Sequence, residues 1–159
     1  MGIHGKWLLL AVCAMVATAA QAGDRFTLKV KSEFKPAREA VETAITNRGM
    51  IVNNVSHVGN MLERTGKEAG LGGAVYGTAE VLEFCSAVVS RKMMEADPHN
   101  IVYCPYTIAV YTLPGDPRTT YLSYRQPPVQ ASKGRTKETL KAVDTLLRDI
   151  VTEASQSIM

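Results

Sequence analysis

The chain has 159 residues, a formal net charge of +3 and 46% hydrophobic residues, which is enough for one globular domain with its own core. Charged residues make up 21% of the sequence, and the two signs are interspersed without a basic block. This pattern argues against nucleic acid or a polybasic membrane surface as the main partner.

Residues 1–22 are predicted to form a cleavable secretory signal peptide. Lys6 supplies the positive start, residues 7–20 form an uncharged apolar run, and Ala20-Gln21-Ala22 offers a cleavage site with small residues. The run of about 14 residues is shorter than the ~20 that a membrane-spanning helix needs, so a retained anchor is the less consistent alternative. We therefore expect a periplasmic protein that begins near Gly23. Removal of Lys6 with the signal lowers the formal net charge from +3 to +2.

The hydrophobic pattern of the remaining chain predicts alternating strands and helices. Period-two alternation predicts a strand over residues 25–31, and helical spacing after Pro36 predicts a helix that ends at Gly49. The next expected elements are a strand within 50–58, a short helix over 59–69, a glycine-rich loop over 70–77, a strand over 79–85, a helix over 87–96, and strands over 102–113 and 119–125 joined by a turn.

The clearest predicted element is a C-terminal amphipathic helix over residues 136–158. Apolar residues recur in it at steps of three and four and form one stripe, which consists of Leu140, Val143, Leu147, Ile150, Val151, Ala154 and Ile158. Such a helix has to cover an apolar surface. The elements together predict a single α+β domain over residues 23–159, with a mainly antiparallel sheet and helices packed on one face.

Three segments of the chain resemble the DUF302 family, whose members have the TT1751-like α+β fold. The segments are 80–86 (Glu-Val-Leu-Glu-Phe-Cys-Ser), 94–98 (Met-Glu-Ala-Asp-Pro) and 104–111 (Cys-Pro-Tyr-Thr-Ile-Ala-Val-Tyr), and residues 34–49 are similar to the family's first helix with its closing glycine. The resemblance covers about residues 25–126. It implies the fold but no activity, because none is established for the family. Many members place a proline before the second cysteine, whereas here Cys104 precedes Pro105, an order that would turn its thiol toward the other sheet face.

Cys85 and Cys104 are the only cysteines that remain once Cys13 is removed with the signal peptide. One ends a predicted strand and the other opens the next, so the two thiols are expected to be close if these strands are neighbours. Three outcomes stay open. A structural disulfide would close a loop of about 20 residues and stabilise the fold by ~3 kcal/mol in the chain-entropy model. The alternatives are two separate buried thiols, or a redox or metal site.

A metal or haem site would add His99 and Met93 to Cys85 and Cys104. Thiolate, thioether and imidazole groups suit copper, zinc or haem iron. However, the sequence contains no Cys-x-x-Cys, His-x3-His or Cys-x-x-Cys-His spacing. Core packing of Met93 and a loop position for His99 are therefore the simpler interpretation.

The candidate ligand-binding residues are Cys85, Cys104, Tyr106, Glu83 and Tyr124. Five tyrosines lie on the last two predicted strands, and the pairs 103/106 and 121/124 occupy opposite faces because three positions separate their members. One set is expected in the core, and the other in a binding surface or in cross-strand pairs. Glu83 interrupts an apolar strand, either as an outward charge or as a buried carboxylate that needs a partner.

The leading functional hypothesis is an exported, non-catalytic protein that binds a small ligand or a protein partner, with a homodimer as the expected assembly. Gly70-Leu-Gly-Gly73 lacks the phosphate-loop pattern, and the sequence has no Gly-x-Ser-x-Gly elbow. The alternative is a thiol-redox or metal- or haem-binding protein that uses Cys85 and Cys104.

Overall fold

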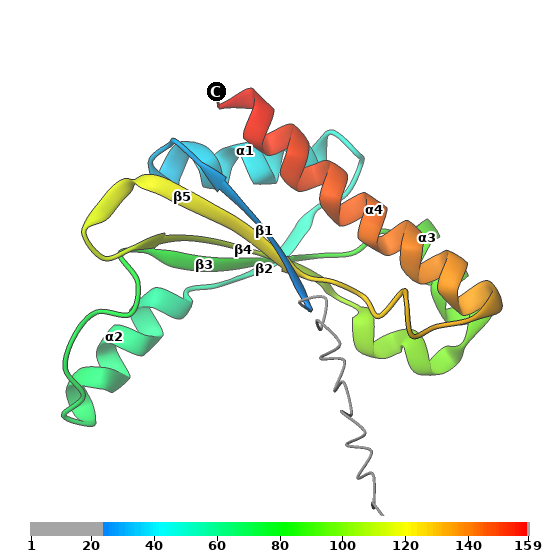
Figure 1. Cartoon of the computed structure of the whole chain (residues 1–159), viewed down its shortest axis with the longest axis horizontal. Coiled ribbons are helices and arrows are strands. Elements are labelled where there is room, and N and C mark those ends of the chain that lie inside the picture. The colour runs from blue at the N-terminus through cyan, green and yellow to red at the C-terminus, as the bar shows by residue number, and fades with distance from the viewer. Residues whose placement is uncertain (1–23, 159) are drawn as a thin grey trace, which may run out of the picture.

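The computed structural model describes residues 24–158, so the predicted signal peptide lies outside the described residues. The elements in chain order are β1 (Arg25–Val30), α1 (Phe34–Thr46), β2 (Val52–Ser56), α2 (Val58–Glu68), β3 (Ala79–Phe84), α3 (Ala87–Ala96), the 3-10 helix η1 (Pro98–Tyr103), β4 (Tyr106–Leu113), β5 (Asp116–Arg125) and α4 (Gly134–Ser157) (Figure 1).

The strands form one antiparallel sheet in the order β1-β5-β4-β3-β2. β4 and β5 are joined at Pro114-Gly115, where Gly115 has a φ of +80°, a backbone conformation that glycine adopts without steric cost. β3 and β4 are neighbours although α3 and η1 separate them in the sequence.

Helices α1, α3 and α4 cover one face of this sheet (Figure 1). At the centre of the sheet the strand side chains that point toward them are fully buried, as Leu82, Ile108 and Leu122 illustrate. The predicted stripe on α4 is buried from Leu140 to Ala154. The expected α+β fold is therefore confirmed. No helix within residues 24–158 has both the length and the apolar composition required to cross a bilayer.

The segment before β4 differs from the sequence prediction. Residues 102–105 are not in the strand, because Pro98–Tyr103 forms η1 and β4 begins at Tyr106. The side chain of Asp97 caps η1 by accepting a hydrogen bond from the backbone N–H of His99 at 2.9 Å. Cys104 follows η1 and precedes a cis peptide bond to Pro105. The period-two alternation of β4 therefore does not extend to Cys104.

Helix α2 extends from the opposite side of the sheet, away from the other three helices (Figure 1). Together with the loop that follows it, it forms what we call the α2 arm (residues 58–76). The helix contains no fully buried residue. Its first turn lies against β3, where a Cβ atom on Gly59 would come within 2.9 Å of the backbone nitrogen of Ala79. Only glycine allows this close approach.

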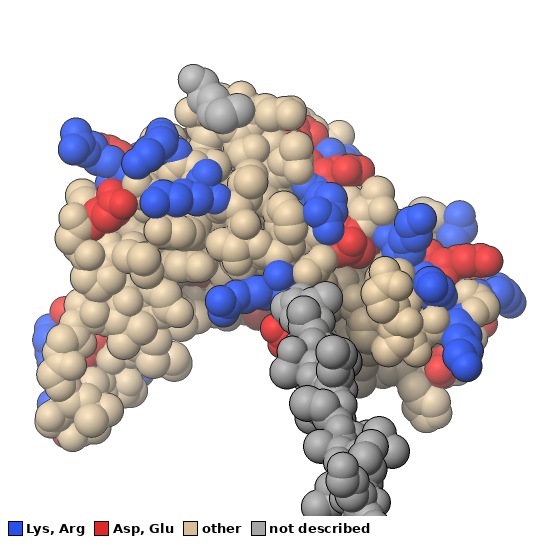
Figure 2. Space-filling model, in the orientation of Figure 1, with Lys and Arg blue, Asp and Glu red and all other residues tan. Residues whose placement is uncertain are grey.

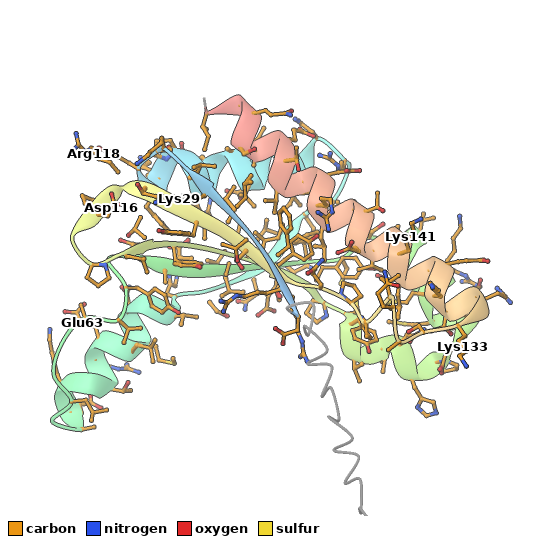
Figure 3. All side chains as sticks on the ribbon, viewed as in Figure 1. Lys29, Glu63, Asp116, Arg118, Lys133 and Lys141 are labelled. Carbon is orange, nitrogen blue, oxygen red and sulfur yellow. The ribbon has the colours of Figure 1, made fainter. Side chains whose placement is uncertain are left out.

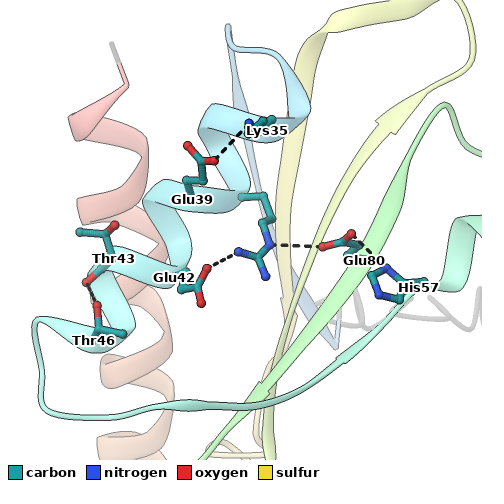
Figure 4. A network of polar contacts seen from close by, with 8 residues as sticks. Lys35, Glu39, Glu42, Thr43, Thr46, His57 and Glu80 are labelled. Atoms are coloured by element: carbon teal, nitrogen blue, oxygen red, sulfur yellow. Dashed lines mark hydrogen bonds and ion pairs between the residues drawn. The ribbon is translucent and has the colours of Figure 1, made fainter.

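A polar network on the helix-covered side links α1, β3 and the start of α2 (Figure 4). The Glu80 side chain is only 17% exposed. It accepts a hydrogen bond from Nε of Arg38 at 3.3 Å and pairs with Nδ1 of His57 at 3.0 Å. Arg38 also pairs with Glu42 on α1. The network therefore satisfies a nearly buried carboxylate and fixes the residue that precedes α2.

The hydroxyl of Tyr124 connects the sheet to α4 and provides a test of their packing. It donates a hydrogen bond to Oδ1 of Asp144 at 3.0 Å, and burial together with this carboxylate raises the pKa of Tyr124. We expect Tyr124→Phe to lower the free energy of unfolding by about 1–2 kcal/mol, because the partly buried carboxylate loses a donor. Urea denaturation measures this. Tyr121→Phe, on the other face, is the control and should change stability little. Equal effects of both substitutions would contradict the assignment.

Candidate functional site

The two cysteine thiols lie together at one end of the sheet. Cys85 follows β3, Cys104 follows η1, and their sulfur atoms are 3.0 Å apart. Both are free thiols and both are partly buried. The antiparallel pairing of β3 with β4 explains the proximity, which the sequence predicted on the condition that these strands are neighbours. Whether the pair forms a disulfide stays a prediction.

Polar groups from α3 and β4 surround the thiol pair. The hydroxyl of Ser90, on the first turn of α3, lies 3.8 Å from the sulfur of Cys104 and hydrogen-bonds with the hydroxyl of Tyr106 at 2.9 Å. Ser86 caps α3 by accepting a hydrogen bond from the backbone N–H of Val89. Ser90 was not among the residues that the sequence pattern indicated. Ser90 lies four residues after Ser86, the residue that caps α3. This spacing would have placed Ser90 beside the thiols only if the orientation of α3 were known.

The surroundings of Cys85 favour the protonated thiol. Burial, followed by the hydrogen bond and the electrostatic effect of the Cys104 thiol, raises the pKa of Cys85 to about 11, against a smaller opposing effect from the backbone N–H of Tyr106. Thiolates, rather than thiols, attack electrophiles and bind metals. Cys85 is therefore not set up as a nucleophile at neutral pH.

The other two proposed metal ligands do not complete a site with the thiols. Met93 is fully buried in the core, and His99 lies exposed on η1. Among residues 24–158, no group of three or more His, Cys, Asp or Glu side chains is arranged to hold a metal ion. The geometry therefore does not assemble Cys85, Cys104, His99 and Met93 into a copper, zinc or haem site.

Two of the predicted ligand-binding tyrosines are core residues, which corrects their assignment to a binding surface. Tyr106 and Tyr124 are 2% and 3% exposed because their strand positions point toward the helices. Tyr106 also lines a cleft of about 240 Å³, together with Pro105, Thr107 and Arg125. Tyr124 lies under α4.

Three partly exposed tyrosines lie on the sheet face opposite α1, α3 and α4, which we call the open face. The rings of Tyr111 and Tyr121 stack with centroids 5.2 Å apart, and Tyr76 from the α2 arm meets Tyr111 edge-on at 5.4 Å. The ammonium group of Lys29 lies 5.7 Å from the centre of the Tyr121 ring. The sequence indicated that one tyrosine set would face outward, but Tyr76 was placed only in a flexible loop.

The strand register arranges the open face in three rows that run across the strands. The tyrosine row contains Lys29, Tyr121, Tyr111 and Ala79. The middle row contains the short side chains Thr27, Ser123, Ala109, Val81 and Ser56. The outer row has Arg25 opposite Arg125 on β1 and β5, and Glu83 between Thr107 and Asn54 on the other strands.

Glu83 therefore lies on the open face as a partly exposed residue, in line with the outward-charge alternative. The hydroxyl of Ser56 lies 3.4 Å from its carboxylate. Glu80, three positions earlier in the strand, faces the helices and is engaged by Arg38 and His57. Of the predicted ligand-binding residues, Cys85 and Cys104 lie together at the end of the sheet, whereas Glu83 lies on a face that Tyr106 and Tyr124 do not share.

Comparison with known proteins identifies the family of this fold. The profile of the family described as "Domain of unknown function DUF302" matches residues 26–154. This match includes most of α4, which the sequence resemblance had left out. A crystal structure of an uncharacterized conserved DUF302 protein from Bacillus stearothermophilus has a similar fold, with a TM-score of 0.69 and 18% sequence identity over 84% of this chain and 99% of that chain. No curated protein has a significant match to this chain.

The raised pKa of Cys85 predicts slow alkylation of the reduced protein. At neutral pH we expect iodoacetamide to modify Cys85 about 100-fold more slowly than an unperturbed cysteine, because the thiolate fraction falls tenfold for each pKa unit between 9.0 and about 11. The rate should rise with pH up to about 11. Peptide mass spectrometry after timed alkylation measures this. Cys104→Ser, which removes the neighbouring thiol, should speed the reaction. Rapid alkylation of Cys85 at neutral pH would contradict the protonated state.

Proposed function

Because the chain belongs to the DUF302 family, whose name assigns no activity, we propose its function from its surface: an exported, non-catalytic domain that binds a partner on the open face. The observation that carries this proposal is the partly exposed stack of Tyr111 on Tyr121, with Tyr76 at its edge. Tyrosines bring a large apolar contact area and a polar tip with little loss of side-chain entropy, which is why interfaces are enriched in them.

The shape of the open face supports binding by a macromolecule. The short side chains of the middle row leave the tyrosine row standing above them, and the α2 arm extends from the same side of the sheet (Figure 1). A partner bound on the open face would therefore contact both the sheet and the side of the α2 arm. Burial, with Tyr76 next in effect, raises the pKa of Tyr111, so its hydroxyl stays a neutral hydrogen-bond donor.

The chemistry of the titratable groups supports a non-catalytic role. In the reduced protein the raised pKa of Cys85 favours the protonated thiol, and the Glu80 carboxylate is occupied by Arg38 and His57. These groups stabilise the fold rather than await a substrate. Export to the periplasm is inferred from residues 1–22 and adds that the partner is met outside the cytoplasm. A homodimer stays a prediction.

Site-specific photocrosslinking tests the binding face in cells that express the full chain. We expect p-benzoylphenylalanine in place of Tyr121 to give a discrete crosslinked product in the exported fraction, because the ring at this position would lie against the partner. The same amino acid in place of Lys141, exposed on α4, is the control and should give none (Figure 3).

Equal crosslinking from both positions, or none from position 121, would overturn the binding face. The mass of the purified protein tests export in the same experiment. We expect a mature chain that begins near Gly23, and an intact leader on a chain retained in the cytoplasm would contradict it.

The sulfur separation of 3.0 Å favours one second candidate, a dithiol–disulfide couple. In this reaction the Cys85 and Cys104 thiols lose two protons and two electrons and form one S–S bond. The electrons reduce the disulfide of an exported thiol oxidant to a dithiol. The raised pKa of Cys85 predicts that the exchange is slow, which suits a structural bond better than a rapidly cycling redox centre.

Intact mass spectrometry separates these outcomes. We expect the protein purified from the exported fraction to be about 2 Da lighter than its reduced form, and Cys85→Ser to abolish this difference. The bond closes a loop of about 20 residues, so the variant should lose about 3 kcal/mol of stability in the chain-entropy model. Two free thiols in the exported protein would contradict the disulfide and leave the binding proposal unaffected.

A further inference from the structure

A cleft of about 240 Å³ opens at the end of the sheet that carries the thiol pair, where η1 leads into β4 and β5 leads toward α4. It is separate from the aromatic stack of the open face, since Tyr76, Tyr111 and Tyr121 do not line it. Its volume is below the roughly 300–1,000 Å³ of clefts that hold drug-sized molecules. The cleft therefore has room for a small molecule rather than for a folded partner.

Most of the cleft is lined by apolar side chains. Val143 and Leu147 belong to the buried stripe of α4, whereas Val102 on η1 is 76% exposed. The remaining apolar or aromatic surface comes from Tyr103, Pro105, Tyr106 and Pro127. An apolar group bound here would remove the side chain of Val102 from water, which is favourable. The walls of the cleft thus favour an organic molecule.

Arg125 is the only charged residue among the ten that line the cleft. Its side chain is exposed, and within residues 24–158 it makes no ion pair or hydrogen bond. Thr107 and Gln126 add polar but uncharged groups to the lining. Apolar walls with a few polar groups that fix orientation are typical of small-molecule sites. The charge of Arg125 makes an anionic group the complementary one.

The carboxylates nearest to the cleft along the chain or across the strands do not line it. Glu83 is opposite Thr107 in the strand register and accepts a hydrogen bond from Ser56 at 3.4 Å. Asp144 accepts the hydrogen bond of Tyr124. Asp24 contacts the end of β5 through its backbone carbonyl. The single positive charge of the lining is therefore not balanced by an acidic lining residue.

We propose that this cleft binds a small organic carboxylate, with its carboxylate group on Arg125 and its apolar body against Val102 and Pro105. A planar guanidinium presents two parallel N–H groups to the two oxygens of a carboxylate, and this geometry favours carboxylate over other anions of the same charge. A bare inorganic anion would leave the apolar walls uncovered. The site goes beyond the proposed function, because it is independent of whether a partner binds the tyrosines of the open face.

Three probes of one carbon skeleton test this site by NMR titration of the purified ¹⁵N-labelled protein. 3-Phenylpropionate carries the carboxylate, 3-phenylpropanamide is its neutral analogue, and 3-phenylpropylamine reverses the charge. We expect 3-phenylpropionate to shift the backbone N–H signals of Tyr103, Thr107 and Gln126 with a dissociation constant of about 1 mM or below. The neutral analogue should bind about tenfold more weakly, because it lacks charge-assisted hydrogen bonds with Arg125, and the amine should not bind.

Matched charge variants locate the carboxylate on the molecule. Arg125→Gln should weaken binding of 3-phenylpropionate about tenfold or more, because it removes the charged donors. Arg118→Gln makes the same charge change at the other end of β5, about 23 Å away along an extended strand, and should change the affinity less than twofold (Figure 3). This control is needed because other Lys and Arg side chains lie over the end of the sheet where β5 begins and along α4 (Figure 2).

A second pair of variants tests the apolar wall. Val102→Ser should weaken binding of 3-phenylpropionate about threefold, because it removes apolar contact area at the rim. Val88→Ser is the control: Val88 is 64% exposed on α3, does not line the cleft, and its replacement should leave the affinity unchanged. All of these substitutions are at exposed positions, and the NMR spectrum of each variant checks that the fold is retained.

Several results would overturn the carboxylate site. Equal binding of the charged and neutral probes, or equal loss of affinity in Arg125→Gln and Arg118→Gln, would show that Arg125 does not hold the carboxylate. Signal shifts only at residues outside the lining, or no saturable binding, would exclude the cleft. If inorganic phosphate binds as tightly as 3-phenylpropionate, the apolar walls contribute nothing and the organic ligand is excluded. The open face is tested separately, by the crosslink from position 121.

Discussion

The packing of α4 against the sheet is the constraint from which the rest of the molecule follows. Its apolar stripe is almost completely buried, and it closes a core that α1, α3 and one face of the sheet share. Once three helices occupy that side, every second residue of each strand belongs to the core. The remaining strand residues form the open face. The same packing therefore produces both the stable interior and the exposed surface that we propose for binding.

This one-sided arrangement separates two kinds of polar chemistry. On the covered side, each polar group is matched by a nearby partner: Tyr124 by Asp144, Tyr106 by Ser90, and Glu80 by Arg38 and His57. Within residues 24–158 no buried side-chain nitrogen or oxygen lacks a hydrogen-bond partner. Such groups stabilise a particular arrangement of helices and strands. On the open face, Tyr111 and Tyr121 remain partly exposed to solvent.

The sequence predicted what depends on local periodicity. The period-two strands, the 3.6-residue stripe of α4 and the closeness of Cys85 to Cys104 follow from spacing, provided that the strands are neighbours. Alternation also established that Tyr121 and Tyr124 lie on opposite faces, but not which face the helices cover. That choice depends on helix packing between distant segments. The η1 turn is missed for a different reason: residues 102–103 are apolar and β-branched or aromatic, as in a strand, and the cap at Asp97 overrides this preference.

The α2 arm is anchored to the sheet at both ends, while its apolar side chains are exposed to solvent. This combination is consistent with the proposed binding role. The start of the arm is held by the close approach of Gly59 to β3 and by the pair between His57 and Glu80. Its end is held by the contact of Tyr76 with Tyr111. An arm held in one orientation loses little conformational entropy when a partner binds, so more of the contact energy appears as affinity. An arm needed only for stability would turn its apolar groups toward the sheet. Here Met61, Leu71 and Val75 stay exposed to solvent, so they add little to the stability of the isolated domain, as expected for the binding surface that we propose.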